Sequence, residues 1–191
     1  GPVHSPCTVT IGTGPVGYGV PTQGEGPAMK LSKTNFLIYR ECAHNAWIKI
    51  HRPEVYNAEP LSVFDQTIID AGNEVDVLAR DLFPGGVTIA RGAAAGTAEL
   101  VRSRAPVLYQ PVFETERFTT ACDILVWNAA SETYDLYEVK ASTSGEDKTA
   151  KNRLYTYDIG FQAEVLRQTA VPLGGLHLVR LDSTYVRGEA I

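Results

Sequence analysis

Apolar residues recur along this chain in two rhythms, one of three to four positions and one of two. The first is the period of an amphipathic helix, and the second is that of a half-buried strand. The pattern predicts one helix from a Ser32 cap to His51-Arg52-Pro53. It predicts a second helix that begins with a Ser62 and Asp65 capping box and ends at Pro84-Gly85-Gly86. The second helix carries an apolar stripe that we expect it to bury: Phe64, Ile68, Ala71, Val75, Leu78, Ala79 and Leu82.

The rest of the pattern mixes strands and helices. Three runs rich in β-branched and aromatic residues follow one another with polar turns between them, as in an antiparallel meander. The predicted elements are a weak strand 87–90, a helix 97–104, meander strands 107–114, 118–127 and 134–141, a polar loop 144–152, a helix 154–169, and a strand 176–181 with which 184–187 can pair. This order predicts an α/β fold in which helices flank one central mixed sheet.

Composition excludes several classes of protein. The 191 residues are 44% hydrophobic and 20% charged, as in an ordinary globular protein. No apolar run approaches the ~18 residues of a membrane span. The net charge of -5 argues against a protein that holds nucleic acid by bulk charge, although it leaves room for a local basic groove. Cys7, Cys42 and Cys122 are too few for a disulfide framework, which favours a reducing compartment and a cytoplasmic location.

Residues 1–28 differ from the rest, which we take as one domain over 29–191. They hold seven of the 17 glycines and five of the 11 prolines but a single charged side chain, Glu25. Such a stretch cannot bury enough surface to offset its ordering entropy. We expect the native product to begin at the only methionine, Met29, with 1–28 disordered or derived from vector or upstream sequence.

The candidate chemistry lies in the meander. Side chains alternate between the two faces of a strand, so Glu138 and Lys140 share one face while Val139 points to the other. A hairpin would place Asp123 of the preceding strand beside Glu138. Two close carboxylates are costly to bury unless a cation lies between them, and Mg²⁺ takes carboxylate oxygens, a backbone carbonyl and waters. The alternative is a cross-strand ion pair on an exposed sheet face.

Other polar residues are candidates, each with a plainer alternative. Glu74 lies at the margin of the apolar stripe of the second helix, where its carboxylate either points toward the sheet or faces solvent. Gln162 on the third helix either reaches a phosphate or Lys140, or is a surface amide. Glu146-Asp147-Lys148 repeats the Glu-x-Lys pattern in a hydrophilic loop, where a solvated run of charges is the better interpretation.

Together these residues resemble the motif set of the PD-(D/E)XK nuclease superfamily, in the RecB-like branch that includes the CRISPR-adaptation nucleases. The motif order of that branch falls on Glu74, Asp123, Glu138-Val139-Lys140 and Gln162. Segments similar to an uncharacterised bacterial family of the branch are 29–37, 78–85, 136–144 and 161–167. The likeness covers nearly all of 29–187. It implies a restriction-endonuclease-like core, in which helices flank a three-strand antiparallel meander and a further strand that follows a helix.

The resemblance implies a divalent-metal-dependent nuclease that hydrolyses phosphodiester bonds, with DNA as the expected substrate and RNA as an alternative. It implies that Mg²⁺ or Mn²⁺ is bound by Asp123, Glu138, the carbonyl of Val139 and Glu74. Lys140 would activate or position the attacking water, and Gln162 would orient the site. The candidates for holding the phosphate backbone are Lys148, Lys151 and Arg153, although for Lys148 alone a solvated loop is the simpler interpretation.

Two departures from the family pattern bear on this expectation. Leu166 stands where many relatives carry Tyr, which puts one substrate contact in question. The iron–sulfur nucleases of the branch have three cysteines after the core, whereas no cysteine follows Cys122, so we expect no iron–sulfur cluster. The alternative function is a catalytically silent nuclease-fold module that binds nucleic acid or a protein partner, and a second is a hydrolase of another phosphodiester. The similar family is often longer, which leaves room for a partner domain or protein.

Overall fold

The structure is a computed structural model that describes residues 29–143 and 149–186, apart from the side chains of 149–151. The expectations for residues 1–28 lie outside this part of the chain. In chain order the elements are β1 (Leu31–Ser32), α1 (Lys33–Glu41), α2 (Ala43–His51), α3 (Pro53–Tyr56), α4 (Val63–Arg80), β2 (Val87–Thr88), α5 (Ala94–Arg102), β3 (Val107–Tyr109), β4 (Val112–Glu114), β5 (Phe118–Ala121), β6 (Ile124–Asn128), β7 (Thr133–Thr143), α6 (Thr149–Gln168) and β8 (Leu173–Leu181).

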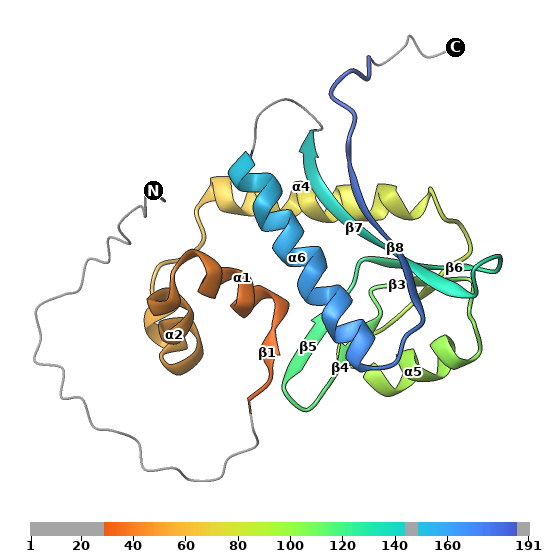
Figure 1. Cartoon of the computed structure of the whole chain (residues 1–191). Coiled ribbons are helices and arrows are strands. Elements are labelled where there is room, and N and C mark those ends of the chain that lie inside the picture. Colours follow the sequence, from red (N-terminus) through yellow and green to blue (C-terminus); the bar gives the residue numbers. More distant parts are fainter. Residues whose placement is uncertain (1–28, 144–148, 187–191) are drawn as a thin grey trace, which may run out of the picture.

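Two mixed sheets form the centre of the molecule, with helices on both sides (Figure 1). The larger sheet has the strand order β2-β3-β6-β7-β8, and the smaller has the order β1-β5-β4. Strands β3, β6 and β7 are antiparallel neighbours, whereas β8 runs parallel to β7 after the crossover through α6. Helix α4 packs against β7, and α6 packs against β8 and β5. The expected α/β class with helices flanking a mixed sheet is therefore confirmed, with two sheets in place of one.

The predicted first helix is three helices in the structure. Cys42 adopts extended backbone angles (φ -152°, ψ 110°), which separates α1 from α2. Pro53 begins α3 rather than ending the helical region, because a proline at the first helical position lacks only an N–H that would have no helical partner. The second helix begins where the sequence predicts. The Ser62 hydroxyl accepts from the Asp65 N–H, and the Asp65 carboxylate accepts from the Ser62 N–H.

Each of the first two meander strands is divided between the two sheets. The run 107–114 bends at Gln110, whose φ of 54° lies in the left-handed region, so β3 joins the large sheet and β4 the small one. The run 118–127 divides in the same way at Cys122 and Asp123, between β5 and β6. The last strand follows α6 as predicted but begins at Leu173. Residues 184–186 form no strand.

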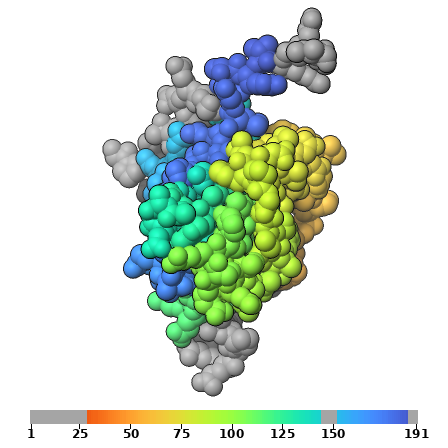
Figure 2. Space-filling model, turned by 90° about the vertical axis from the view of Figure 1, so that its right-hand side faces the viewer, coloured from red at the N-terminus to blue at the C-terminus, as the bar shows by residue number. Residues whose placement is uncertain are grey.

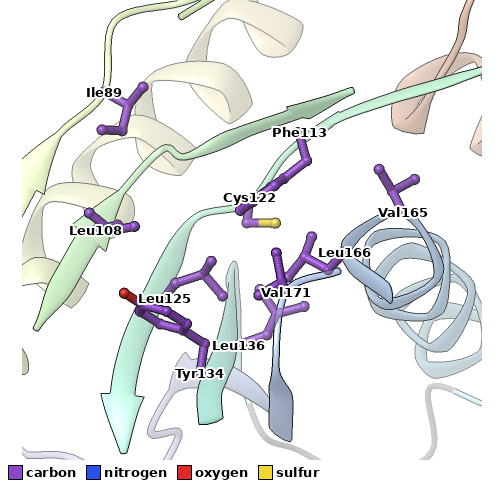
Figure 3. Packing of buried hydrophobic residues seen from close by; sticks show 10 residues of the cluster. All are labelled: Ile89, Leu108, Phe113, Cys122, Leu125, Tyr134, Leu136, Val165, Leu166 and Val171. Atoms are coloured by element: carbon purple, nitrogen blue, oxygen red, sulfur yellow. The ribbon is translucent and has the colours of Figure 1, made fainter. Parts of the chain in front are cut away.

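The large sheet has a buried hydrophobic cluster on each face. On the α6 side, Leu125, Leu136 and Cys122 from the sheet meet Val165 and Leu166 from the helix (Figure 3). On the α4 side, Ile124 and Tyr109 pack with Ala79. Along β7, therefore, even-numbered side chains point toward α6 and odd-numbered ones toward α4, as the alternation of a strand requires. This alternation determines which residues of β7 can form a site with α6.

Helix α4 buries a different face from the one expected. Ala79 is 5% exposed and Gly72 and Asp76 are half-buried, whereas Phe64 and Leu78, in the predicted stripe, are 72% and 61% exposed. The helix rests on β7 through small and polar residues that allow close approach, so the row of large apolar side chains is left at the surface. Within the described residues, no helix combines the length and the apolar character needed to cross a lipid bilayer.

Candidate functional site

Strand β7 carries two charged residues on its α6 face. Leu136, Glu138 and Lys140 point toward α6, whereas Tyr137 and Val139 point toward α4. Glu138 is 1% exposed and lies in the middle of β7. A carboxylate at such a depth needs partners that donate hydrogen bonds or carry positive charge.

Three side chains meet the Glu138 carboxylate. The Lys140 ammonium lies 2.5 Å from Oε1, and the side-chain amide of Gln162, on α6, donates to Oε2 at 2.6 Å. The Lys33 ammonium, at the start of α1, lies 3.3 Å from Oε1. The structure thus brings together Glu138, Lys140 and Gln162, which the sequence predicts as neighbours, and adds a lysine that it does not predict.

Asp158 is a second buried carboxylate beside Glu138. It lies one turn before Gln162 on α6 and is 2% exposed. Lys140 approaches its Oδ2 to 2.5 Å, and Gln162 donates to its Oδ1 at 2.8 Å. Lys33 lies 3.4 Å from the same Oδ1. We call these five residues, Lys33, Glu138, Lys140, Asp158 and Gln162, the charge cluster. In it, two lysines and one amide each bridge the same two carboxylates.

Burial and charge act against each other in the charge cluster. Burial raises the pKa of Glu138 to about 7, because the lowering by Lys33 and Lys140 does not offset the desolvation and the nearby charges of Asp123 and Asp158. Burial also tends to raise the pKa of Asp158, but the positive charges of Lys33 and Lys140 outweigh this effect, so the pKa of Asp158 is lowered. Burial alone would lower the pKa of Lys33 and of Lys140, yet the two carboxylates raise both. Both lysines are therefore charged at neutral pH, and Glu138 is close to its titration point.

Asp123 precedes β6 and lies beside the peptide bond that follows Glu138. Its Oδ2 accepts a hydrogen bond from the Val139 N–H at 2.7 Å. The antiparallel register pairs Ile124 with Tyr137 and so places Asp123 next to Glu138, as expected for a hairpin of these two strands. The two carboxylates are close enough for the charge of Asp123 to raise the pKa of Glu138. They differ in access, because Glu138 is buried and Asp123 is half-buried.

Asp123 lines a polar cavity between α4 and the sheet. This polar cavity has a volume of about 460 Å³ and is lined by Gly72, Asn73, Asp76, Arg80, Ile89, Arg91, Gln110, Asp123 and Val139. Asp76 lies in it, held by Arg80 at 2.6 Å and by the Gln110 amide at 3.1 Å. The charge cluster and the polar cavity meet at the peptide bond between Glu138 and Val139.

The structure does not bring every predicted residue to this site. Glu74 has an exposed side chain and does not line the polar cavity, whereas Asp76, two residues later, does. Arg153 is exposed near the beginning of α6. Lys148 and the side chain of Lys151 lie outside the described residues. Over 29–143 and 149–186, no group of three or more His, Cys, Asp or Glu side chains is placed to hold a metal ion.

Two residues of the charge cluster, Lys33 and Asp158, were not predicted as site residues from the sequence. Asp158 stands in the apolar row of its helix, four residues after Leu154 and four before Gln162, so a carboxylate at a buried position was visible in the periodicity. Lys33 gave no such signal, because it directly follows the Ser32 cap and looks like an ordinary charge of a first helical turn. The pairing of β1 with β5 and the contacts of α1 with α6 and β5 bring Lys33 to the sheet.

Comparison with protein-family models, with curated proteins and with solved structures gives no match.

Proposed function

We propose that the protein is a divalent-metal-dependent nuclease of the PD-(D/E)XK type, with DNA as its substrate. One observation carries the proposal. Glu138 and Lys140 share a buried face of β7, Gln162 reaches them from the next helix, and Asp123 borders the same peptide from the neighbouring strand. This is the arrangement that the motif order of that superfamily leads us to expect. The antiparallel strands β3, β6 and β7, followed by α6 and parallel β8, support a restriction-endonuclease-like core.

The donor atoms fit a hard cation that keeps part of its water shell. The site offers carboxylate, amide and backbone oxygens, and Mg²⁺ commonly takes only one or two carboxylates and several waters. The Gln162 Oε1 is buried without a hydrogen-bond partner beside Glu138, so one acceptor there is unused. Asp123 and Glu138 would hold the ion, while Asp76 lines the polar cavity beside Asp123. A bound Mg²⁺ or Mn²⁺ would supply an activated water and charge stabilisation at phosphate.

The protein residues have separate tasks in this proposal. Lys140 holds a positive charge where negative charge develops on the phosphate, and its contact with Asp158 fixes the ammonium in place. Gln162 keeps the two buried carboxylates apart by donating to both. Arg91 lines the polar cavity and also the neighbouring hollow beside Lys33, so a phosphate backbone passing Asp123 would meet a guanidinium.

One observation favours the rival function, a silent nuclease-fold module that binds nucleic acid or a protein. The carboxylate of Glu138 is already bound by Lys33, Lys140 and Gln162. A closed network of this kind needs no metal for charge balance, because two ammonium groups offset two carboxylates. A nuclease must open it, whereas a silent module keeps it closed.

The test is hydrolysis of labelled single- and double-stranded DNA and RNA with Mg²⁺, Mn²⁺ or EDTA, alongside a small phosphodiester. We expect metal-dependent cleavage of DNA that Asp123→Asn abolishes and Asp76→Asn weakens. Glu74→Gln is the matched control, since it changes an exposed carboxylate on the same helix and should leave the rate unchanged. Binding of DNA without cleavage under all metal conditions would instead support the silent module.

A further inference from the structure

Helix α4 presents an apolar row to solvent, in which Val75 alone is half-buried. The row occupies every third or fourth position from just before the helix to just after it: Leu61, Phe64, Ile68, Ala71, Val75, Leu78 and Leu82. Its large members Leu61, Phe64, Ile68, Leu78 and Leu82 are 63%, 72%, 54%, 61% and 62% exposed. The yellow and yellow-green atoms of α4 lie at the molecular surface in Figure 2. An exposed apolar patch of this extent marks an interaction site rather than an ordinary surface.

The apolar row is not the face that the fold itself uses. Helix α4 contacts β7, and its buried residue is Ala79, with half-buried Gly72, Asp76 and Arg80 on the same side. That side also lines the polar cavity. The helix therefore carries two functional faces, one toward the sheet and the cavity and one toward solvent. The row does not depend on the nuclease proposal.

The spacing of the row identifies the shape of its partner. Steps of three and four alternate without a break, which gives a mean period of 3.5 residues rather than 3.6. A strict 3.5-residue repeat keeps an apolar seam facing a second helix along its length, as in a coiled coil. The 18 residues of α4 extend about 27 Å, so a helix of similar length can lie along the whole row.

The charges beside the row identify the partner's chemistry. In a helix pair, the positions that flank the apolar seam decide which helices associate. Here the charged flanking residues are Asp65, Glu74 and Asp81, and none is basic. The only basic residue of α4 is Arg80, which is paired with Asp76 on the cavity side. Two copies of α4 would bring carboxylates together, so self-association is disfavoured, whereas lysine or arginine beside a partner's seam would be attracted.

We propose that α4 docks an amphipathic helix of another protein, one with leucine-like residues at three-four spacing and basic residues flanking them. A second copy of this chain is the occupant that the acidic flanks disfavour.

The probe is a three-heptad synthetic peptide with leucines at the seam and lysines at the flanking positions, measured by fluorescence anisotropy against the full chain. The matched peptide has glutamates in place of the lysines. We expect the basic peptide to bind at least about tenfold more tightly than the acidic one, with a preference that falls as salt rises. Glu74→Lys should reduce that preference.

The row itself is tested with the double variant Ile68→Ser and Leu78→Ser, which changes two exposed side chains and should fold normally by circular dichroism. It should lose binding about tenfold or more. The control is Val186→Ser, which removes a more exposed apolar side chain outside α4 and should bind as wild type. Equal binding of both peptides, or unchanged binding by the double variant, would overturn the proposal. A concentration-dependent dimer that the double variant abolishes would also overturn it, because the occupant would then be a second copy.

Discussion

The ammonium of Lys140 lies 2.5 Å from the carboxylate of Asp158, so strand β7 and helix α6 are joined by a partly buried ion pair. The same ammonium lies 2.5 Å from Glu138 on its own strand. Lys140 is therefore held between two carboxylates, and its position is fixed by both sides. A cation held in this way loses little by reorganisation when negative charge develops beside it.

Lys140→Ala should lower the rate of DNA cleavage by roughly a hundredfold or more, because one fixed electrostatic contact with the transition state is lost. Metal binding should survive, since the carboxylates remain. Lys140→Arg should rescue poorly, as a broad planar guanidinium replaces a compact ammonium. Single-turnover kinetics and Mn²⁺ titration measure the two effects. Activity near that of wild type in Lys140→Ala would remove this residue from the mechanism.

Lys33→Ala should tighten the binding of Mn²⁺ to the metal-free protein. The Lys33 ammonium lies 3.3 Å from Glu138 and 3.4 Å from Asp158, so it competes with a metal for the Glu138 carboxylate. Lys30→Ala is the matched control, because Lys30 pairs with exposed Glu114. Calorimetric titration should show a lower dissociation constant for Lys33→Ala alone. Weaker binding in that variant would mean that Lys33 orders the site instead of competing for it.

Stability of the metal-free protein should fall as the pH rises from about 5 to 8. The folded state raises the pKa of Glu138 from 4.5 to about 7, so between these values the folded protein holds a proton that the unfolded chain releases. That proton stabilises the fold fully below pH 4.5, and its contribution is lost as the pH rises through 7. The lowered pKa of Asp158 acts in the opposite direction, but only near and below its ordinary value of 3.8.

Urea unfolding at several pH values in EDTA measures this effect, which amounts to at most roughly 3 kcal/mol. In Glu138→Gln the fall between pH 5 and 8 should be absent, because the titrating group is gone. Glu164→Gln, which removes an exposed carboxylate of α6, should keep the wild-type profile. Stability that increases over this range in wild type would contradict the assignment.

Gly86→Ala should destabilise the fold by about 1–3 kcal/mol, since a Cβ there would lie 2.4 to 2.8 Å from atoms of the Tyr109 ring. That ring cannot easily move, because its hydroxyl donates to the Phe83 carbonyl and accepts from the Gly86 N–H.

Gly96→Ala, in α5, should instead stabilise the fold. No atom lies within 4 Å of its Cβ position, so the helix should gain about 0.5–1 kcal/mol. Thermal melts of the two variants should shift in opposite directions.

Local sequence patterns predicted most of the helices and strands. The face that each element buries depends on contacts between residues far apart in the chain, and these the sequence did not show. The Ser62 and Asp65 capping box fixed the beginning of α4 because both partners are three residues apart. The face that α4 buries depends on the shape of β7, and there the small side chains of Gly72 and Ala79 prevailed over the larger apolar row. The same rotation of the helix brings Asp76 rather than Glu74 to the polar cavity.

The charge cluster could likewise be predicted only in part from the sequence. Alternation along one strand places Glu138 and Lys140 on a common face, which needs no knowledge of the rest of the chain. The partners Lys33 and Asp158 come from α1 and α6, and only the three-dimensional arrangement brings them to that face. The helical period could indicate that Asp158 is buried, but nothing in the sequence marked Lys33 or showed the element against which either residue packs.

Strand β1 sets when the site can form during folding. Its two residues pair with Phe118 and Thr119, and Lys33 follows directly, so its contact with Glu138 joins positions 105 residues apart. Loop closure over such a span costs more entropy and comes later than the local β6–β7 hairpin. Until β1 docks, Glu138 and Asp158 share the single ammonium of Lys140. The charge balance of the site is thus completed by the Lys33 contacts, which have the largest sequence separation in the charge cluster, so the complete cluster should form after the β6–β7 hairpin.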